Sequence, residues 1–348
     1  MFDYKTFFFV IPTPLSILPE PIRALIPQWL KQGQDLALQG KLPAYIPQLA
    51  AVQPPIIALA IGLKDAPMIN HWQGEALGDN SLINSESSNG ISLDDCRNNS
   101  PSPRFPLMSL IKPFLLLYLL QKHGADRVWH LVDAVASDLP FNVIPIAKPP
   151  NPMLNCGAIA LCSLLVSEAH QGDHGAKNLQ NWLSQMMRPS ASDQAQLNYG
   201  AAPELSVDTA MLASVRSVPQ RRNLAIAKAL EALAIVDDGA AALAIYEEIC
   251  CFSTDVIGLA QLGKALLATE PMTELVLEVM TNCGMYGYSA AFAQNVGIPA
   301  KSAVSGAILG ILPHQAAIVC YSPPLDAIGN SVAGLFLLEQ VKSYLAKV

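Results

Sequence analysis

The run FPLMSLIKPFLLLYLL, residues 105–120, constrains this chain more than any other stretch, because nearly every side chain in it must leave water. It is too short to span a bilayer, which takes ~20 apolar residues, so it predicts a helix in a protein core. Proline fits a helix only near its first turn, because it lacks an N–H and its ring clashes with the carbonyl four residues earlier. Pro113 therefore predicts that this helix begins close to Ser109.

Lys112 is the one charged residue of the run, and its nearest acidic residues in the chain are Asp95 and Asp126. Residues three apart share a helix face, so Ser109 and Lys112 would lie side by side at the positive end of the helix dipole. Desolvation lowers the pKa of an ammonium group, and a neutral lysine is a competent general base for a neighbouring hydroxyl. The pair indicates nucleophilic serine chemistry. The alternative is a lysine that extends its amine from a core helix to the surface, since a Ser-x-x-Lys spacing arises by chance about once per chain.

The composition is that of a globular protein, with 348 residues, 51% hydrophobic content and 14% charged residues. Such a chain can bury a large core, in one big domain or two interlocked ones. The net charge of -7 and the lack of a Lys/Arg cluster beyond QRRN disfavour nucleic acid as a partner. We expect small ligands or proteins as partners instead.

The seven cysteines are odd in number and show neither a CxxC pair nor a zinc spacing, which indicates buried thiols in a reducing compartment. The apolar N-terminus MFDYKTFFFVIPTPLSIL resembles part of a signal peptide, but proline interrupts it and no A-x-A cleavage site follows. No window reaches the ~20 unbroken apolar residues of a membrane span. We therefore expect a cytoplasmic protein with no membrane partner.

Apolar patterns predict strands near both ends of the chain and helices between them. PPIIALAIGL indicates a buried strand, KSAVSGAILGIL and QAAIVCYS indicate β structure, and SVAGLFLLEQVKSYLAKV indicates an amphipathic closing helix. Helical patterns dominate from Phe105 to about Ala291. The predicted fold class is α/β (α+β), with an antiparallel sheet from both chain ends flanked by helices, plus a helical subdomain.

These patterns predict an N-terminal extension over 1–30 and one domain over 31–348. The domain has three expected parts: a sheet part (31–77 and 292–348), a mobile insertion (78–104) and a helical part (105–291). The insertion is rich in Asn and Ser and nearly free of large apolar side chains, which is typical of a surface loop.

Four further motifs accompany the Ser-x-x-Lys pair: NPMLNCGAI, CGMYGYS, GIPAKSAVSGAIL and SPPLDAIGNSV. With them the chain resembles the serine-dependent glutaminase family, whose fold is related to the β-lactamases and penicillin-binding transpeptidases. The resemblance implies that 31–348 is a glutaminase-like catalytic domain that hydrolyses L-glutamine to L-glutamate and ammonia through a Ser-Lys acyl-enzyme mechanism. It implies no cofactor and no metal, and we expect a homo-oligomer, either a dimer or a tetramer.

The resemblance also implies roles for individual residues. Ser109 resembles the nucleophile and Lys112 its base, and two tyrosines match the pair that relays protons and contacts substrate: Tyr246 and Tyr286. Other matching positions contact the substrate: Tyr45, Asn155 and Asn223 at its amino-acid end, and Val304, whose backbone with the Ser109 amide would form an oxyanion hole. Lys301 and Ser302 correspond to the Lys-Ser/Thr-Gly strand of the wider superfamily.

Each of these residues also has a purely structural interpretation. A half-buried tyrosine is more often a packing residue with a satisfied hydroxyl, and asparagines such as Asn155 and Asn223 often cap helices. HQGDH, with His170 and His174 beside Asp173, has metal-ligand residues, but its glycines indicate a loop and we predict no metal.

The chain departs from the family pattern around the pocket. Where the family has a Ser-Glu pair whose glutamate binds the substrate ammonium, this chain has Ser214 and Val215. Met108 replaces a common glutamine, and Ala303 replaces a glycine.

Three functions remain open: a glutaminase with shifted anchoring, an amidohydrolase for another amide, and a non-catalytic glutaminase-like binding protein. A cell-wall peptidase or β-lactamase would need export, which the cysteines and the N-terminus disfavour.

Deleting most of residues 78–104 tests the insertion. Its polarity leaves little apolar surface to offset the entropy of ordering, so the melting temperature should stay within a few degrees of wild type. A loss of soluble expression on deletion would show that the segment packs against the domain or bridges subunits.

Overall fold

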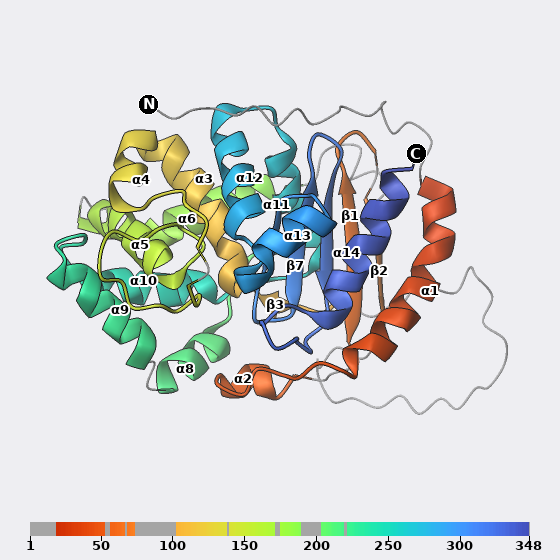
Figure 1. Ribbon diagram of the computed structural model, residues 1–348, viewed down its shortest axis with the longest axis horizontal. Helices are drawn as coiled ribbons and strands as arrows, with labels where there is room; N and C mark the ends of the chain where they lie inside the picture. Colours follow the sequence, from red (N-terminus) through yellow and green to blue (C-terminus); the bar gives the residue numbers. More distant parts are fainter. Residues whose placement is uncertain are drawn as a thin grey trace.

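The computed structural model describes residues 19–52, 56–66, 68–73, 102–137, 139–170, 175–188, 203–218 and 221–347. Figure 1 shows a sheet flanked by helices on one side of the molecule and a helical part on the other. This arrangement confirms the predicted fold class. The N-terminal residues 1–18, most of the expected insertion and residues 171–174 of HQGDH lie outside the described residues.

The main sheet has five strands in the order β2-β1-β8-β7-β6, and every neighbouring pair is antiparallel. The two chain ends meet where β1 pairs with β8, with Ala58 opposite Tyr321. The strands are β1 (Ile57–Leu63), β2 (Ile69–Gln73), β6 (Ala300–Ser302), β7 (Ala307–Leu312) and β8 (Ala316–Tyr321). A sheet built from both chain ends was the sequence prediction, and it is confirmed.

Strand β1 is apolar throughout because both faces of the sheet are covered. Ile57, Leu59 and Ile61 belong to a core cluster with α1 (Pro19–Ala37) and α14 (Val332–Leu345). The alternate residues Ala58 and Ala60 belong to a second cluster, which includes α11 (Val256–Lys264) and the helical part. A seven-residue strand with every side chain buried follows directly from this double covering.

Helix α1 is a single helix that contains Pro27 and crosses residue 30, where we expected the extension to end. Its residues Ile22, Ile26 and Leu30 are buried in the same cluster as the sheet. The division of the chain at residue 30 stays a prediction, but α1 itself is part of the core.

A second, three-stranded sheet in the order β3-β5-β4 lies beside the start of the 105–120 run. Its strands are β3 (Phe105–Pro106), β4 (Ser206–Val207) and β5 (Phe252–Thr254), too short to give a periodic signal in the sequence. Arg104 donates to Ser206 Oγ at 2.9 Å and to the Ser253 carbonyl at 2.8 Å. The last residues of the expected insertion are therefore held on this sheet.

The helical part places three candidate site residues, Lys112, Asn155 and Tyr246, on three helices: α3 (Ile111–His123), α5 (Asn155–His170) and α10 (Gly239–Cys250). Helix α5 packs against both of the others. Their neighbours are α4 (Ala125–Leu131), α6 (Gly175–Met186), α8 (Thr209–Ser217), α9 (Arg221–Ala232), α12 (Pro271–Cys283) and α13 (Ser289–Asn295), with the short α2 (Pro47–Ala50). Among the described residues, no helix combines the length and the apolar character needed to cross a membrane.

Gly157 in NCGAI allows the start of α5 to approach the preceding turn. A Cβ built on Gly157 would lie 2.1 Å from the Asn151 carbonyl oxygen, closer than any real contact. Gly157→Ala should lower the free energy of unfolding by about 1–3 kcal/mol, because backbone must shift to make room. Gly287→Ala is the control in chemical denaturation, since its nearest atom would be 4.0 Å away. Equal stability of the two variants would contradict this close approach.

Candidate active site

Ser109 lies in the 3-10 turn η1 (Met108–Leu110), directly before α3, so the helix begins where Pro113 predicted. Its side chain is buried at 7% exposure. Met108 just before it has a positive φ of 47°, and so does Tyr286, at 54°. A left-handed backbone at residues with a side chain costs free energy, persists only where the surroundings enforce it, and concentrates at functional sites.

Lys112 is 1% exposed, and its amine binds neutral oxygens rather than a carboxylate. Nζ donates to the Met153 carbonyl at 2.9 Å and to Asn155 Oδ1 at 2.8 Å. Desolvation lowers the pKa of Lys112 to about 8. A neutral amine has two N–H groups and one lone pair, so these two acceptors can use both hydrogens and leave the lone pair free. The arrangement is suited to a base.

Asn155 joins three of the other candidate residues. Its Oδ1 also accepts a hydrogen bond from the Tyr246 hydroxyl at 2.9 Å, and its Nδ2 donates to Asn223 Oδ1 at 3.0 Å. These contacts fix the amide orientation, because its oxygen must face two donors and its nitrogen an acceptor. The Asn155 side chain therefore binds Lys112, Tyr246 and Asn223. It does not cap α5, which was the structural alternative for an asparagine at this position.

Tyr286 contacts Ser109 from the 3-10 turn η3 (Tyr286–Tyr288). Its hydroxyl donates to the Ser302 carbonyl at 3.0 Å and shares a hydrogen bond with Ser109. Since the phenol hydrogen is used on Ser302, Ser109 is the donor in that second bond. Burial raises the pKa of both Tyr286 and Tyr246, so both phenols stay neutral. Lys112 is therefore better suited than either tyrosine to accept the Ser109 proton.

Lys301 is a second fully buried lysine beside the site, and burial lowers its pKa well below the ordinary value. Its Nζ donates to the Gly284 carbonyl at 3.0 Å and lies 4.4 Å from the centre of the Tyr286 ring. The positive charges of Lys112 and Lys301 oppose each other. This repulsion adds to burial in lowering the pKa of Lys301.

Tyr45 and Val304 border this cluster. Tyr45 is half exposed, but burial of its hydroxyl end raises its pKa to about 12, and that hydroxyl interacts electrostatically with Tyr286. Val304 lies in the turn after β6, a strand that packs against η1. Within the described residues, the Val304 amide makes no backbone hydrogen bond, so it is available to a ligand.

Hydrogen bonds link six of the eight candidate residues in two groups. Asn155 joins Lys112, Tyr246 and Asn223, and Ser109 is joined to Tyr286. Sequence reasoning missed the Met153 and Gly284 carbonyls that hold the two lysines. It also missed Phe141, whose ring lies 5.6 Å from that of Tyr286. Backbone acceptors carry no residue-type signal, so no pattern in the sequence could have identified the carbonyls.

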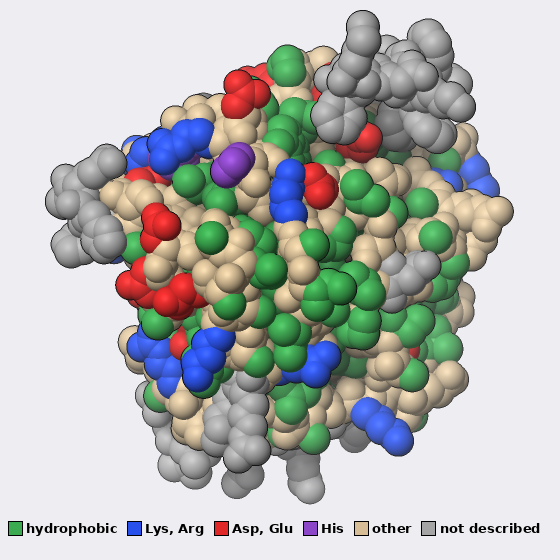
Figure 2. All heavy atoms as spheres, turned by 60° about the vertical axis from the view of Figure 1, so that its left-hand side comes forward, with side chains coloured by type: hydrophobic (Ala, Val, Ile, Leu, Met, Phe, Trp, Pro, Cys, Tyr) green, Lys and Arg blue, Asp and Glu red, His purple; other side chains and the backbone are tan. Residues whose placement is uncertain are grey.

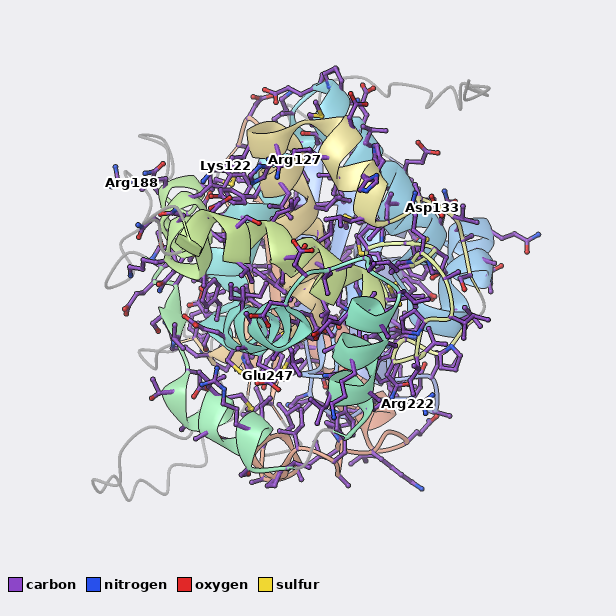
Figure 3. The ribbon with its side chains drawn as sticks, turned by 90° about the vertical axis from the view of Figure 1, so that its left-hand side faces the viewer. Lys122, Arg127, Asp133, Arg188, Arg222 and Glu247 are labelled. Carbon is purple, nitrogen blue, oxygen red and sulfur yellow. The ribbon has the colours of Figure 1, made fainter. Side chains whose placement is uncertain are left out.

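Val215, at the position of the family glutamate, is buried in the core on α8 and brings no charge to the pocket. The next residue, Arg216, reaches Glu247 on α10, with Nε and Oε2 3.4 Å apart. Figure 3 labels Glu247 between α10 and α8, one residue beyond Tyr246 in sequence. Burial raises the pKa of Glu247, while Arg216 opposes that shift. The acidic side chain nearest to Tyr246 in sequence is thus already paired with an arginine.

Neither metal ligands nor disulfides are found in the described part of the chain. No group of three or more His, Cys, Asp or Glu side chains there could hold a metal ion. Six cysteines are described and all are free, five of them buried, while Cys96 lies outside the described residues.

The cluster combines a buried serine, a lysine of lowered pKa and two neutral tyrosines, the side chains that serine hydrolase chemistry requires. Comparison with known proteins gives the family. The family model described as Glutaminase matches residues 98–347. A glutaminase of Synechocystis is 33% identical over 97% of this chain and 95% of its own length. Glutaminase 2 of Escherichia coli K12 is 28% identical over 93% and 97%.

Solved structures agree. The structure of the probable glutaminase ybaS is 27% identical, has a TM-score of 0.70, and covers 92% of this chain and 97% of its own. A probable glutaminase of Bacillus subtilis, solved with 6-diazo-5-oxo-L-norleucine, is 22% identical and shares the fold with a TM-score of 0.72, covering 94% and 97%. The chain belongs to the glutaminase family, as its motifs predicted.

The pKa of Lys112 predicts the pH dependence of activity. Below about 8 Lys112 is protonated and cannot act as a base, so kcat/KM should rise about tenfold per pH unit up to about pH 8 and then level off. Lys177→Met, which removes an exposed lysine on α6, should leave the profile unchanged. A profile that stays flat from pH 6 to 9 would contradict the role of Lys112.

Proposed function

We propose that this protein hydrolyses L-glutamine to L-glutamate and ammonia through an acyl-enzyme on Ser109. The carrying observation is Lys112, a buried amine held by two carbonyl oxygens one helical turn from a serine at a helix start. Membership of the glutaminase family supports the substrate. Family membership and the assembled cluster favour catalysis over a binding protein without activity.

In the first step Ser109 Oγ attacks the side-chain amide carbon and Lys112 Nζ accepts the serine proton. The developing oxyanion would face the amides of Ser109 and Val304, where each donor contributes about 2.7–4 kcal/mol by comparison with other oxyanion holes. The intermediate collapses as the C–N bond breaks. The Lys112 ammonium returns the proton to the leaving nitrogen, and ammonia departs.

In the second step water attacks the Ser109 ester. Lys112 accepts a proton from the water and returns it to Ser109 Oγ as the acyl–oxygen bond breaks. In the resting site Tyr286 accepts the single hydroxyl hydrogen of Ser109 while its own hydrogen is fixed on Ser302. The Ser109 hydroxyl therefore turns that hydrogen to Lys112 Nζ before the attack. Tyr246 holds Asn155, and through it the Lys112 amine. Without these contacts the amine could turn its lone pair away from Ser109.

Substrate anchoring falls to Tyr45, Asn155 and Asn223 in this proposal. Amide and phenol groups can donate hydrogen bonds to the carboxylate end of an amino acid. Val215 supplies no partner for the substrate ammonium. We therefore expect neutral hydrogen-bond acceptors to bind the substrate ammonium. Glu247 could bind it instead if its ion pair with Arg216 opened.

The protein's assembly and location remain predictions. We infer a homo-oligomer, supported by the exposed apolar side chains Val135, Leu139 and Ile146 in one segment. On the face shown in Figure 2, lysine and arginine side chains are scattered among acidic ones rather than gathered in a stripe, which fits a small-molecule substrate better than nucleic acid. A cytoplasmic location is part of the same proposal.

Ser109→Ala should abolish ammonia release from glutamine without changing the melting temperature by more than a few degrees. Lys112→Ala should be nearly as damaging, because the two residues act as a unit. The control is Ser184→Ala on α6, an exposed serine whose hydroxyl bonds only its own helix. Wild-type rates in purified Ser109→Ala would refute the nucleophile. A panel of amides measured on wild type would show whether another amide is the better substrate.

A further inference from the structure

Five polar side-chain atoms behind the Val304 turn are buried without a hydrogen-bond partner among the described residues. They are Ser302 Oγ, Ser305 Oγ, Ser322 Oγ, and both Oδ1 and Nδ2 of Asn330. Their residues are at most 3% exposed. Folded proteins leave few such atoms unpaired, so the four on Ser305, Ser322 and Asn330 are informative.

Hydrogen bonds bring three of these residues, Ser305, Ser322 and Asn330, to one junction. The Ser322 amide donates to the Gly306 carbonyl at 3.0 Å, which places Ser305 beside Ser322. Gly306 has a φ of 94°, and a Cβ on it would lie 2.4 Å from the Ser322 carbonyl, so only glycine allows this approach. Ser331 Oγ donates to the Ser322 carbonyl at 2.6 Å, which places Asn330 at the same junction.

This junction supports both sides of the candidate active site. The turn Ala303–Gly306 is closed by the Gly306 amide on the Ala303 carbonyl at 3.0 Å, and it carries Val304. On the other side, a Cβ on Gly329 would lie 3.8 Å from the Tyr286 ring. The loop that carries Asn330 therefore adjoins the phenol that binds Ser109.

A buried amide group without a partner loses the hydrogen bonds that water would give it, which destabilises the folded protein. Internal water molecules usually satisfy such groups, each making about three hydrogen bonds. Asn330 offers two donors and two lone pairs, and the neighbouring hydroxyls offer both donors and acceptors. The set matches the needs of bound water.

We propose that Ser305, Ser322 and Asn330 hold internal water behind the Val304 turn, and that Asn330 is thereby a positioning residue for the Val304 amide. The inference rests on the proposed function, because it assumes that this amide stabilises the oxyanion. The water would hold the turn in the one orientation that points the amide toward Ser109. Loss of this support should reduce kcat more than substrate binding, because an oxyanion forms only during reaction.

The test compares Asn330→Leu, which keeps the volume but no polar atom, with Asn330→Ser, which leaves room for a further water. Asn330→Leu should lower kcat about tenfold or more, with KM for glutamine within about twofold. Asn330→Ser should recover most of the loss. An Asn330→Leu enzyme with kcat within twofold of wild type would overturn the proposal, and so would a change confined to KM.

Thr254→Val is the matched control, because Thr254 Oγ1 is also buried and unpartnered among the described residues but lies on β5. It should leave kcat unchanged. If Asn330→Leu does not fold, kcat is measured for Ser322→Ala instead. A kcat below that of wild type supports the inference, and an unchanged kcat overturns it. A wild-type enzyme without glutaminase activity would instead refute the proposed function, so the two failures are distinguishable.

Discussion

The pair of hydrogen bonds from Lys112 to Met153 and Asn155 is the constraint on which the rest of the site depends. A buried ammonium without a counter-charge is costly, so the chain must either pair it or let it lose its proton. Here it is surrounded by apolar side chains and neutral oxygens, and this environment lowers its pKa to about 8 and so raises the fraction of neutral amine. The position of Asn155, Tyr246 and Asn223 follows from the need to hold that amine in one orientation.

The site lies where the two cores of the molecule meet. Ser109, Lys112 and Asn155 come from the helical part, while Ser302 ends the edge strand β6 of the main sheet and Val304 follows it. Tyr286 bridges them, since it contacts both Ser109 and Ser302. The positive φ values of Met108 and Tyr286 fall at this junction, where packing on both sides can enforce them. Packing on both sides holds Ser109 and the Val304 amide in a fixed relative position.

Much of this could be predicted from the sequence, for identifiable reasons. Pro113 located the helix start, and long apolar runs located β1, β7 and β8, because these signals are local. The three-stranded sheet escaped prediction because β3 and β4 have two residues each. The partners of Lys112 escaped it as well, because Met153 contributes a backbone oxygen from 41 residues away. Asn155 was identified only through its motif, since an asparagine at a helix start more often caps it.

The most direct test of this account is the titration of Lys112 itself, followed by NMR of lysine side chains labelled at the ε-carbon and assigned with Lys112→Met. The account predicts a pKa of about 8, well below that of exposed lysines in the same spectrum. It also predicts a rise toward the ordinary value if Asn155→Asp places a carboxylate beside the amine. A Lys112 that titrates above pH 10 in wild type would contradict the account, because burial would then not have raised the fraction of neutral amine that can act as the base for Ser109.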